Sequence, residues 1–428
     1  MIYFLISISA ILYGLAYILP YQLCWLIFPA FSIIFFLGRS RKLTFLAGFT
    51  WGLVAFGIHT FPPFYCLYTI TLSVWLFVGW FLLSSYLALY AGLWFYGASK
   101  FGWVIVSWLF IIIMDRYCLW IFDYWEGYCC LHPLVPLMTQ PKLFYFLPII
   151  GTAGMTLLFL CTAASSAAFL IKPRLKMGLL VLGLCLVWST GFCIRREHVQ
   201  PTWLTKIGYA RVPFVPFKKI NNLEHAQKIC LELQRVMQAK SQVQIIFMPE
   251  STLPCALNNC PRVESCIVEN IQHVQLVLGS QRLEGDSVYN CCYWLGNNTV
   301  LNYYDKQHGV FFVERVPRLF NFLSHSQPFV QSTATRPIFK LLDDVECMPV
   351  LCSDLFFAHN NPAQSPEHIL LCLANDAWFL GSVIPDLLFL SARLKSSSWG
   401  QQLLYVSYTR GVYFNGFGDV HRIDFDLY

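Results

Sequence analysis

The chain has 428 residues, of which 57% are hydrophobic, 17% aromatic and only 12% charged, and its formal net charge is +6. A soluble domain carries about 25% charged residues, so this composition excludes an ordinary soluble protein and predicts a membrane protein. The modest positive charge gives no reason to expect a nucleic-acid-binding protein, and we expect no nucleic-acid partner.

The apolar residues form long blocks up to about Ile194 and only short runs after it. A membrane-spanning helix needs about 20 apolar residues, and seven blocks approach or exceed that length. We therefore predict a membrane domain over residues 1–195, with about seven transmembrane helices, and a globular domain over residues 200–428. The predicted spans are residues 1–20, 22–37, 43–60, 67–95, 103–122, 143–171 and 177–194.

Basic residues predict the orientation of these spans. The loops after even-numbered spans contain Arg39, Arg41, Lys42, Lys100, Lys172, Arg174 and Lys176, whereas the loops after odd-numbered spans are nearly bare. Because cytoplasmic loops collect Lys and Arg, we expect the N-terminus in the cytoplasm and the globular domain on the outer face. One span more or fewer would reverse this prediction. Asp115 and Arg116, inside the fifth predicted span, indicate either a functional site or a pair at a water-accessible helix end.

Three apolar runs of the globular part end next to chemically reactive side chains. Residues 243–248 stop before Glu250, residues 299–304 before Lys306, and residues 348–351 before Cys352. Each run is typical of a buried strand, and ligand sites in layered α/β domains gather where strands end. The pattern therefore predicts that these three side chains form one site.

These residue types suit acyl transfer through a thiol. A cysteine is mostly protonated at neutral pH, so Cys352 needs a base such as Glu250 or a neighbouring cation such as Lys306. The cation could also stabilise the oxyanion formed when the thiol attacks a carbonyl group. The thioester would then release its acyl group to an amine or to water. Taken singly, each charged residue is more readily explained as an exposed charge, and Cys352 as a small buried side chain.

The sequence contains seventeen cysteines, and it does not show which of them form disulfides. Cys255, Cys260 and Cys266 lack the spacing of a zinc site, and we expect neither a metal nor a cofactor. If the globular domain lies outside the cytosol, some of its cysteines could form disulfides, but the sequence does not select the pairs.

Four motifs together resemble the nitrilase, or carbon–nitrogen hydrolase, superfamily, and within it the apolipoprotein N-acyltransferase family. Residues 248–254 (MPESTLP) are similar to the P-E-T/S-x-x-P turn of the family. Residues 304–308 (YDKQH), followed by Glu314, resemble its Y-D-K-x-H stretch and downstream glutamate. Cys352 follows Val350 and Leu351 where the family has its nucleophile, and residues 375–379 (NDAWF) are similar to a further signature.

The resemblance implies a multi-pass α-helical membrane domain joined to an α/β nitrilase-like αββα sandwich. It implies a bacterial inner membrane protein with its sandwich on the periplasmic side, acting without a cofactor. The acyl chain would pass from a phospholipid donor to Cys352 and then to the N-terminal amine of a lipoprotein acceptor. By position, Glu250 would be the base, Lys306 the oxyanion-stabilising cation and Cys352 the nucleophile, with Glu314 and Asp354 in supporting positions.

The sequence also departs from the family. Ser353 and Asp354 replace an aromatic residue and a glutamate after the nucleophile, Phe311 and Val313 replace proline and glycine, and residues 391–410 keep only scattered family positions. A final hydrophobic span of the family is expected to be absent from this sequence, which ends at Tyr428. Two alternatives follow: a divergent relative with another acyl or amide substrate, as encoded in plasmid conjugal-transfer loci, or a non-catalytic membrane scaffold. Retention of Glu250, Lys306, Glu314 and Cys352 argues against the scaffold.

Overall fold

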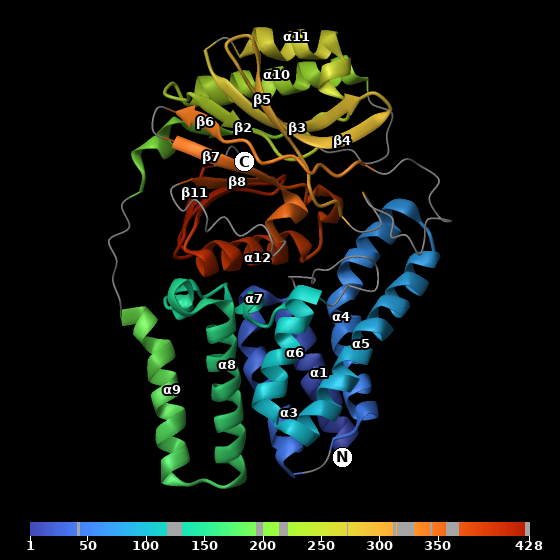
Figure 1. Ribbon diagram of the computed structural model, residues 1–428, viewed down its shortest axis with the longest axis vertical. Helices are drawn as coiled ribbons and strands as arrows, with labels where there is room; N and C mark the ends of the chain where they lie inside the picture. The colour runs from blue at the N-terminus through green and yellow to red at the C-terminus, as the bar shows by residue number, and fades with distance from the viewer. Residues whose placement is uncertain are drawn as a thin grey trace. The chain divides into compact units, whose positions relative to one another are not determined.

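The computed structural model divides into two compact units, residues 1–196 with 379–398 and residues 197–378 with 399–428 (Figure 1). The residues it describes are 1–40, 43–117, 131–193, 200–213, 221–271, 273–310, 314, 329–342, 345–356 and 368–423. The first unit is helical and the second contains two β-sheets. The predicted fold class, an apolar helical part followed by an α/β part, is confirmed, whereas the bounds 1–195 and 200–428 stay a prediction.

The helical unit contains long apolar helices. Within the described residues, four helical stretches have the length and composition to cross a membrane: Pro20–Arg39, Phe45–Thr71, Trp75–Phe101 and Leu147–Ile171. Three apolar helices are shorter, namely α1 (Ile2–Ile18), α6 (Trp103–Tyr117) and α9 (Leu175–Cys193). The other helices here are α2 (Pro20–Leu23), α3 (Ile27–Ser40), α4 (Phe45–Thr71), α5 (Trp75–Phe101), α7 (Leu134–Leu137), α8 (Leu147–Ile171) and most of α12 (Ile384–Trp399).

The helix α4 is longer than the sequence predicts. The sequence favours a break after residue 60, at the prolines Pro62 and Pro63, but the helix runs through both to Thr71. Proline inside a membrane helix is tolerated where neighbouring groups satisfy the local backbone. Trp80 of α5 donates a hydrogen bond to the Gly57 carbonyl at 3.0 Å, close to the prolines. The helix α4 thus contacts α5 beside the prolines and continues where the local sequence favours a break.

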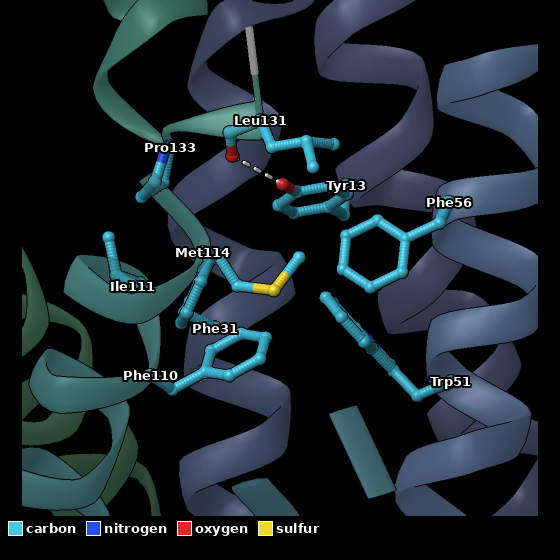
Figure 2. A pocket seen from close by; sticks show the side chains of 9 residues that line it. All are labelled: Tyr13, Phe31, Trp51, Phe56, Phe110, Ile111, Met114, Leu131 and Pro133. Carbon is cyan, nitrogen blue, oxygen red and sulfur yellow. Dashed lines mark hydrogen bonds between the residues drawn. The ribbon is translucent and has the colours of Figure 1, made fainter. Parts of the chain in front are cut away.

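Aromatic side chains and Met114 surround a small apolar pocket inside the helical unit (Figure 2). The Tyr13 hydroxyl donates a hydrogen bond to the Leu131 carbonyl at 2.9 Å, which fixes the segment before α7 against α1. The side chain of Met114 points toward the rings that line the pocket (Figure 2). The lining residues are Tyr13, Phe31, Trp51, Phe56, Phe110, Ile111, Met114, Leu131 and Pro133.

The second unit contains a five-stranded and a six-stranded mixed sheet. The first has the order β1-β2-β3-β4-β5, formed by β1 (Ile207–Tyr209), β2 (Ile245–Phe247), β3 (Gln275–Glu284), β4 (Ser287–Gly296) and β5 (Thr299–Asp305). The second has the order β11-β10-β9-β8-β7-β6, formed by β6 (Phe339–Leu342), β7 (Val345–Leu351), β8 (Ile369–Leu373), β9 (Gln402–Val406), β10 (Gly411–Asn415) and β11 (Val420–Arg422). Strands β1, β2 and β3 are parallel neighbours, as are β7, β8 and β9.

Alternation along β2 explains why this sheet is covered on both faces. Successive side chains of a strand point to opposite faces. Ile245 and Phe247 join a core cluster shared with the second sheet, whereas Ile246 joins a cluster with the helices α10 (Asn222–Ala239) and α11 (Pro261–Asn270). The helices, the first sheet and the second sheet thus form three successive layers (Figure 1).

Candidate active site

The ends of two strands in the first sheet bring Glu250 and Lys306 into direct contact. Glu250 lies three residues beyond β2, and Lys306 follows β5 directly. The Lys306 Nζ lies 2.8 Å from Glu250 Oε1 and 2.8 Å from Glu314 Oε2. All three residues are almost fully buried, with 3%, 3% and 7% of their surfaces exposed for Glu250, Lys306 and Glu314. The buried ammonium group of Lys306 therefore forms ion pairs with both carboxylates.

Asn290 of β4 completes this cluster, and the sequence analysis did not select it. Its side-chain nitrogen donates to Glu250 Oε1 at 2.8 Å and to Glu314 Oε1 at 2.5 Å. Its backbone carbonyl accepts from the Lys306 N–H at 2.8 Å, because the antiparallel register of β4 and β5 brings the two residues together. Lys306, Glu250, Asn290 and Glu314 thus form a closed ring of polar contacts. The signal in the sequence that could have selected Asn290 is a single amide side chain within the largely apolar stretch that forms β4.

A glycine allows the turn that carries Glu250 to lie against β3. A Cβ atom added to Gly279 would lie 2.4 Å from the Glu250 Cα and 2.5 Å from the Ser251 nitrogen. The Gly279 N–H also donates to the Pro249 carbonyl at 3.1 Å. Side chains other than glycine would therefore displace the turn and the carboxylate it positions.

Burial and charge set the protonation of this cluster. Burial raises the pKa of Glu250, and the nearby Glu314 raises it further, against the opposing effects of Lys306 and Asn290. Burial by itself would lower the pKa of Lys306, but the carboxylates of Glu250 and Glu314 outweigh it and hold that pKa well above its usual value. Lys306 therefore remains a cation at neutral pH, and Glu250 takes up a proton more readily than an exposed glutamate.

Cys352 begins the turn after β7 in a strained backbone conformation. Its φ angle is +42°, in the left-handed region that residues other than glycine rarely adopt, and the residue is partly exposed. Burial raises the pKa of its thiol, and Glu250 raises it further, whereas Lys306 opposes this increase. Burial and the nearby carboxylates therefore favour the protonated form of the Cys352 thiol in the resting site.

Asp354 holds the turn that follows Cys352. It is fully buried, and its carboxylate accepts hydrogen bonds from the Tyr304 hydroxyl at 2.7 Å, the His308 N–H at 2.8 Å and the Leu351 N–H at 3.3 Å. Burial alone would raise the pKa of Asp354, but hydrogen bonding to His308 and the charge of Lys306 outweigh it and lower that pKa. Asp354 therefore ties the Cys352 turn to the segment around Lys306.

The Asn375 segment after β8 closes the site from the second sheet. The Asn375 N–H donates to Glu250 Oε2 at 3.0 Å, and it also favours the Cys352 thiolate. The next residue, Asp376, is fully buried and accepts from the Ser407 hydroxyl at 2.8 Å. The Asn375 backbone donor thus connects the predicted base to the predicted nucleophile.

Several residues selected from the sequence lie outside the described residues. Phe311 and Val313 are among them, and so are residues 121–130, a stretch of the sequence that is rich in Tyr and Trp. Asp115 lies on α6, and the Arg116 side chain is outside the described part of that helix. Across the described residues, no group of three or more His, Cys, Asp or Glu side chains could hold a metal ion.

Comparison with curated proteins gives two partial sequence matches, and no family model matches the chain. An apolipoprotein N-acyltransferase from Rhizobium rhizogenes is 26% identical over 192 residues, which cover 41% of this chain and 36% of that protein. An apolipoprotein N-acyltransferase from Helicobacter pylori is 29% identical over 163 residues, which cover 36% of this chain and 37% of that protein. The chain thus matches little more than a third of the length of each of these relatives.

Comparison with solved structures finds members of the nitrilase superfamily. A mutant amidase from Nesterenkonia AN1 has a TM-score of 0.39 and 14% identity, covering 50% of this chain and 84% of that chain. A carbon–nitrogen hydrolase from Helicobacter pylori has a TM-score of 0.39 and 9% identity, covering 51% of this chain and 85% of that chain. The sequence matches confirm the resemblance drawn from the motifs: the chain is similar to the apolipoprotein N-acyltransferases, as a divergent relative.

Proposed function

We propose that this protein is a membrane-bound N-acyltransferase that moves an acyl chain from a phospholipid, through a thioester at Cys352, to the N-terminal amine of a lipoprotein. The observation that carries the proposal is the buried contact of Lys306 with Glu250 and Glu314. It is supported by the Asn375 N–H, which donates to Glu250 from the end of β8, the strand that pairs with β7 before Cys352. A base, a fixed cation and a thiol are the groups that thioester chemistry requires.

In the first half-reaction, Glu250 takes the proton of Cys352 while the sulfur attacks the carbonyl carbon of the phospholipid ester. The negative charge that develops on the carbonyl oxygen is stabilised by the Lys306 ammonium group, which the two carboxylates keep protonated. The C–O bond of the ester then breaks, and Glu250 returns the proton to the departing alcohol. The products are an acyl thioester on Cys352 and a lysophospholipid.

In the second half-reaction, the lipoprotein amine attacks the thioester carbon and again places a negative charge on the oxygen near Lys306. Glu250 takes a proton from the amine nitrogen, the C–S bond breaks, and Cys352 regains a proton from Glu250. An amide forms and the site returns to its starting state. Glu314 and Asn290 keep Lys306 and Glu250 in place throughout, through contacts between 2.5 and 2.8 Å.

The proposed location is the bacterial inner membrane, with the sheet unit on the periplasmic side. The apolar helices support membrane embedding, where the acyl donor already resides. The distribution of Lys and Arg between the predicted loops supports the orientation. The proposed chemistry needs no cofactor.

The test is acyl labelling of the protein in vesicles that contain a phospholipid with an alkyne-tagged acyl chain. We expect a hydroxylamine-sensitive label on the wild type, no label on Cys352→Ala and strongly reduced labelling of Lys306→Met. The matched control is Cys185→Ser, which removes an exposed thiol on α9 and should be labelled like the wild type. An unlabelled wild type beside a labelled, active apolipoprotein N-acyltransferase would contradict the proposal.

A second candidate, a related acyltransferase with a different acceptor, is favoured by the turn after the nucleophile. Asp354 there is committed to Tyr304, His308 and Leu351, in a stretch where the sequence departs from the family motif. Growth of a strain depleted of its own apolipoprotein N-acyltransferase separates the two candidates. Labelling of Cys352 without restored growth would favour the second acceptor class.

A further inference from the structure

Two cysteines on neighbouring helices contact each other through their sulfur atoms. Cys230 of α10 and Cys266 of α11 have their Sγ atoms 3.8 Å apart, and the Cys230 thiol lies 3.4 Å from the Cys266 carbonyl. Cys230 is buried and Cys266 is half-buried, at the edge of the core cluster that α10 and α11 share with the first sheet. The structure thus brings Cys230 and Cys266 together, and it also brings the side chains of Cys255 and Cys260 into contact.

We propose that Cys230 and Cys266 form a disulfide in the mature protein. Their sulfurs need to close from 3.8 Å to about 2.05 Å for the bond to form. The oxidant is the disulfide of a thiol–disulfide oxidoreductase or of a small thiol such as glutathione. One cysteine attacks it to give a mixed disulfide, and the other displaces the carrier. The two protein thiols lose two electrons and two protons, and the carrier is released as a dithiol or two thiols.

The difference in burial between the two thiols determines which of them reacts with the carrier first. It raises the pKa of the Cys230 thiol to about 12, with a further increase from Cys266, so the folded protein holds little Cys230 thiolate. Cys266 is more accessible and therefore forms the mixed disulfide. Cys230 resolves it while α10 and α11 are still packing together, before burial suppresses its ionisation.

The bond would enclose the segment that carries Glu250. Residues 231–265 lie between the two cysteines, and they include β2 and the turn after it. Closing this loop limits the freedom of the unfolded chain and fixes α10 to α11. The bond needs an oxidising compartment, so the inference rests on the periplasmic location proposed above.

The test is peptide mapping of the full-length protein after its thiols have been trapped in cells with acid and N-ethylmaleimide. Trypsin places Cys230 alone in residues 229–235 and Cys266 alone in residues 263–282. Cys255 and Cys260 share residues 241–262, so a bond between those two would not join separate peptides. We expect one linked species, residues 229–235 with 263–282, which disappears on reduction.

Two variants and one thermal measurement complete the test. Cys266→Ser should lose the linked peptide, and Cys185→Ser, which removes an exposed thiol of α9, should retain it. Reduction of the wild type should lower the midpoint of thermal unfolding by roughly 5–10 °C, with little change in Cys266→Ser. Alkylation of both Cys230 and Cys266 in protein trapped directly from cells would overturn the proposal.

If no linked peptide is found in cells, oxidation of the purified protein with glutathione disulfide distinguishes the possible reasons. A bond that forms with glutathione disulfide but not in cells would show that the sheet unit faces a reducing compartment. A bond that forms in neither setting would overturn the proposal, because oxidation during folding in cells and oxidation of the folded protein would both have failed. Acyl labelling of Cys352 is measured separately, so failure of the proposed function is distinguishable from either result.

Discussion

Replacement of Asn290 by leucine tests whether the ring around Lys306 is held by an amide between two charged carboxylates. The change keeps the side chain close in size but removes the donors to Glu250, at 2.8 Å, and to Glu314, at 2.5 Å. A hydrogen bond to a charged group contributes about 1.5–3 kcal/mol. Lys306 still contacts both carboxylates, so we expect a loss of about 3 kcal/mol, at the lower end of the combined range.

The loss should depend on pH in a defined direction. The Asn290 amide favours the charged form of Glu250, so its removal raises a pKa that burial has already raised. A carboxyl group whose pKa is raised in the folded state costs stability as the pH rises through that pKa. The penalty of Asn290→Leu should therefore be larger at about pH 8 than at about pH 5, because protonation of Glu250 at the lower pH relieves the cost of its lost donor.

The assay is thermal unfolding in detergent at both pH values, where about 3 kcal/mol corresponds to a shift of roughly 6–12 °C. Asn302→Leu on β5 is the matched control, since this half-buried amide accepts only a local bond from the Tyr303 N–H at 2.8 Å among its described contacts. It should shift the midpoint little and equally at both pH values. An equal penalty for Asn290→Leu at both pH values would refute the reasoning.

Three further predictions concern the turns around the thiol. Asp354→Ala removes the buried acceptor of the Tyr304 hydroxyl and the His308 N–H and should cost about 3 kcal/mol in thermal or chemical unfolding at neutral pH. Because the pKa of Asp354 is lowered, this difference should be present above its ordinary value of 3.8 and should shrink as the pH falls through the lower folded value. Cys352→Gly should be more stable than Cys352→Ala by about 1 kcal/mol in the same assay, since φ is +42°; equal stability would argue against strain there. Gly279→Ala should destabilise the sheet unit by about 2 kcal/mol, because the added methyl group would meet the Glu250 turn. The displaced turn should also slow alkylation of Cys352 by iodoacetamide, and an unchanged rate would count against that contact.

The sequence was sufficient to predict an apolar helical part followed by an α/β part, and the strands that present the candidate site. Uninterrupted apolar blocks before Ile194 and short apolar runs after it predict helices followed by strands, because the length of an apolar run indicates which kind of element it forms. The strands β2, β5 and β7 end beside Glu250, Lys306 and Cys352 as expected. The motifs around these residues also identified the relatives that the sequence comparisons found.

Tertiary structure decided which side chains meet. The Asn375 N–H contacts Glu250 across 125 positions of the chain, and Asn290 reaches both Glu250 and Glu314. Local periodicity contains no information about such contacts, since it reports which face of an element is buried and not what lies opposite. The Cys230–Cys266 contact, across 36 positions, was undetermined for the same reason.

The same distinction explains the error at Pro62 and Pro63. Their local effect is to remove backbone donors and favour a break, and the sequence alone supports that prediction. The helix α4 nevertheless continues through both prolines, and it packs closely against α5: a Cβ on Gly52 would lie 2.8 Å from the Ala88 Cα. Short-range hydrophobic pattern therefore determined the kinds of element and their order, whereas packing between distant segments decided helix length, charge pairing and the surroundings of Cys352.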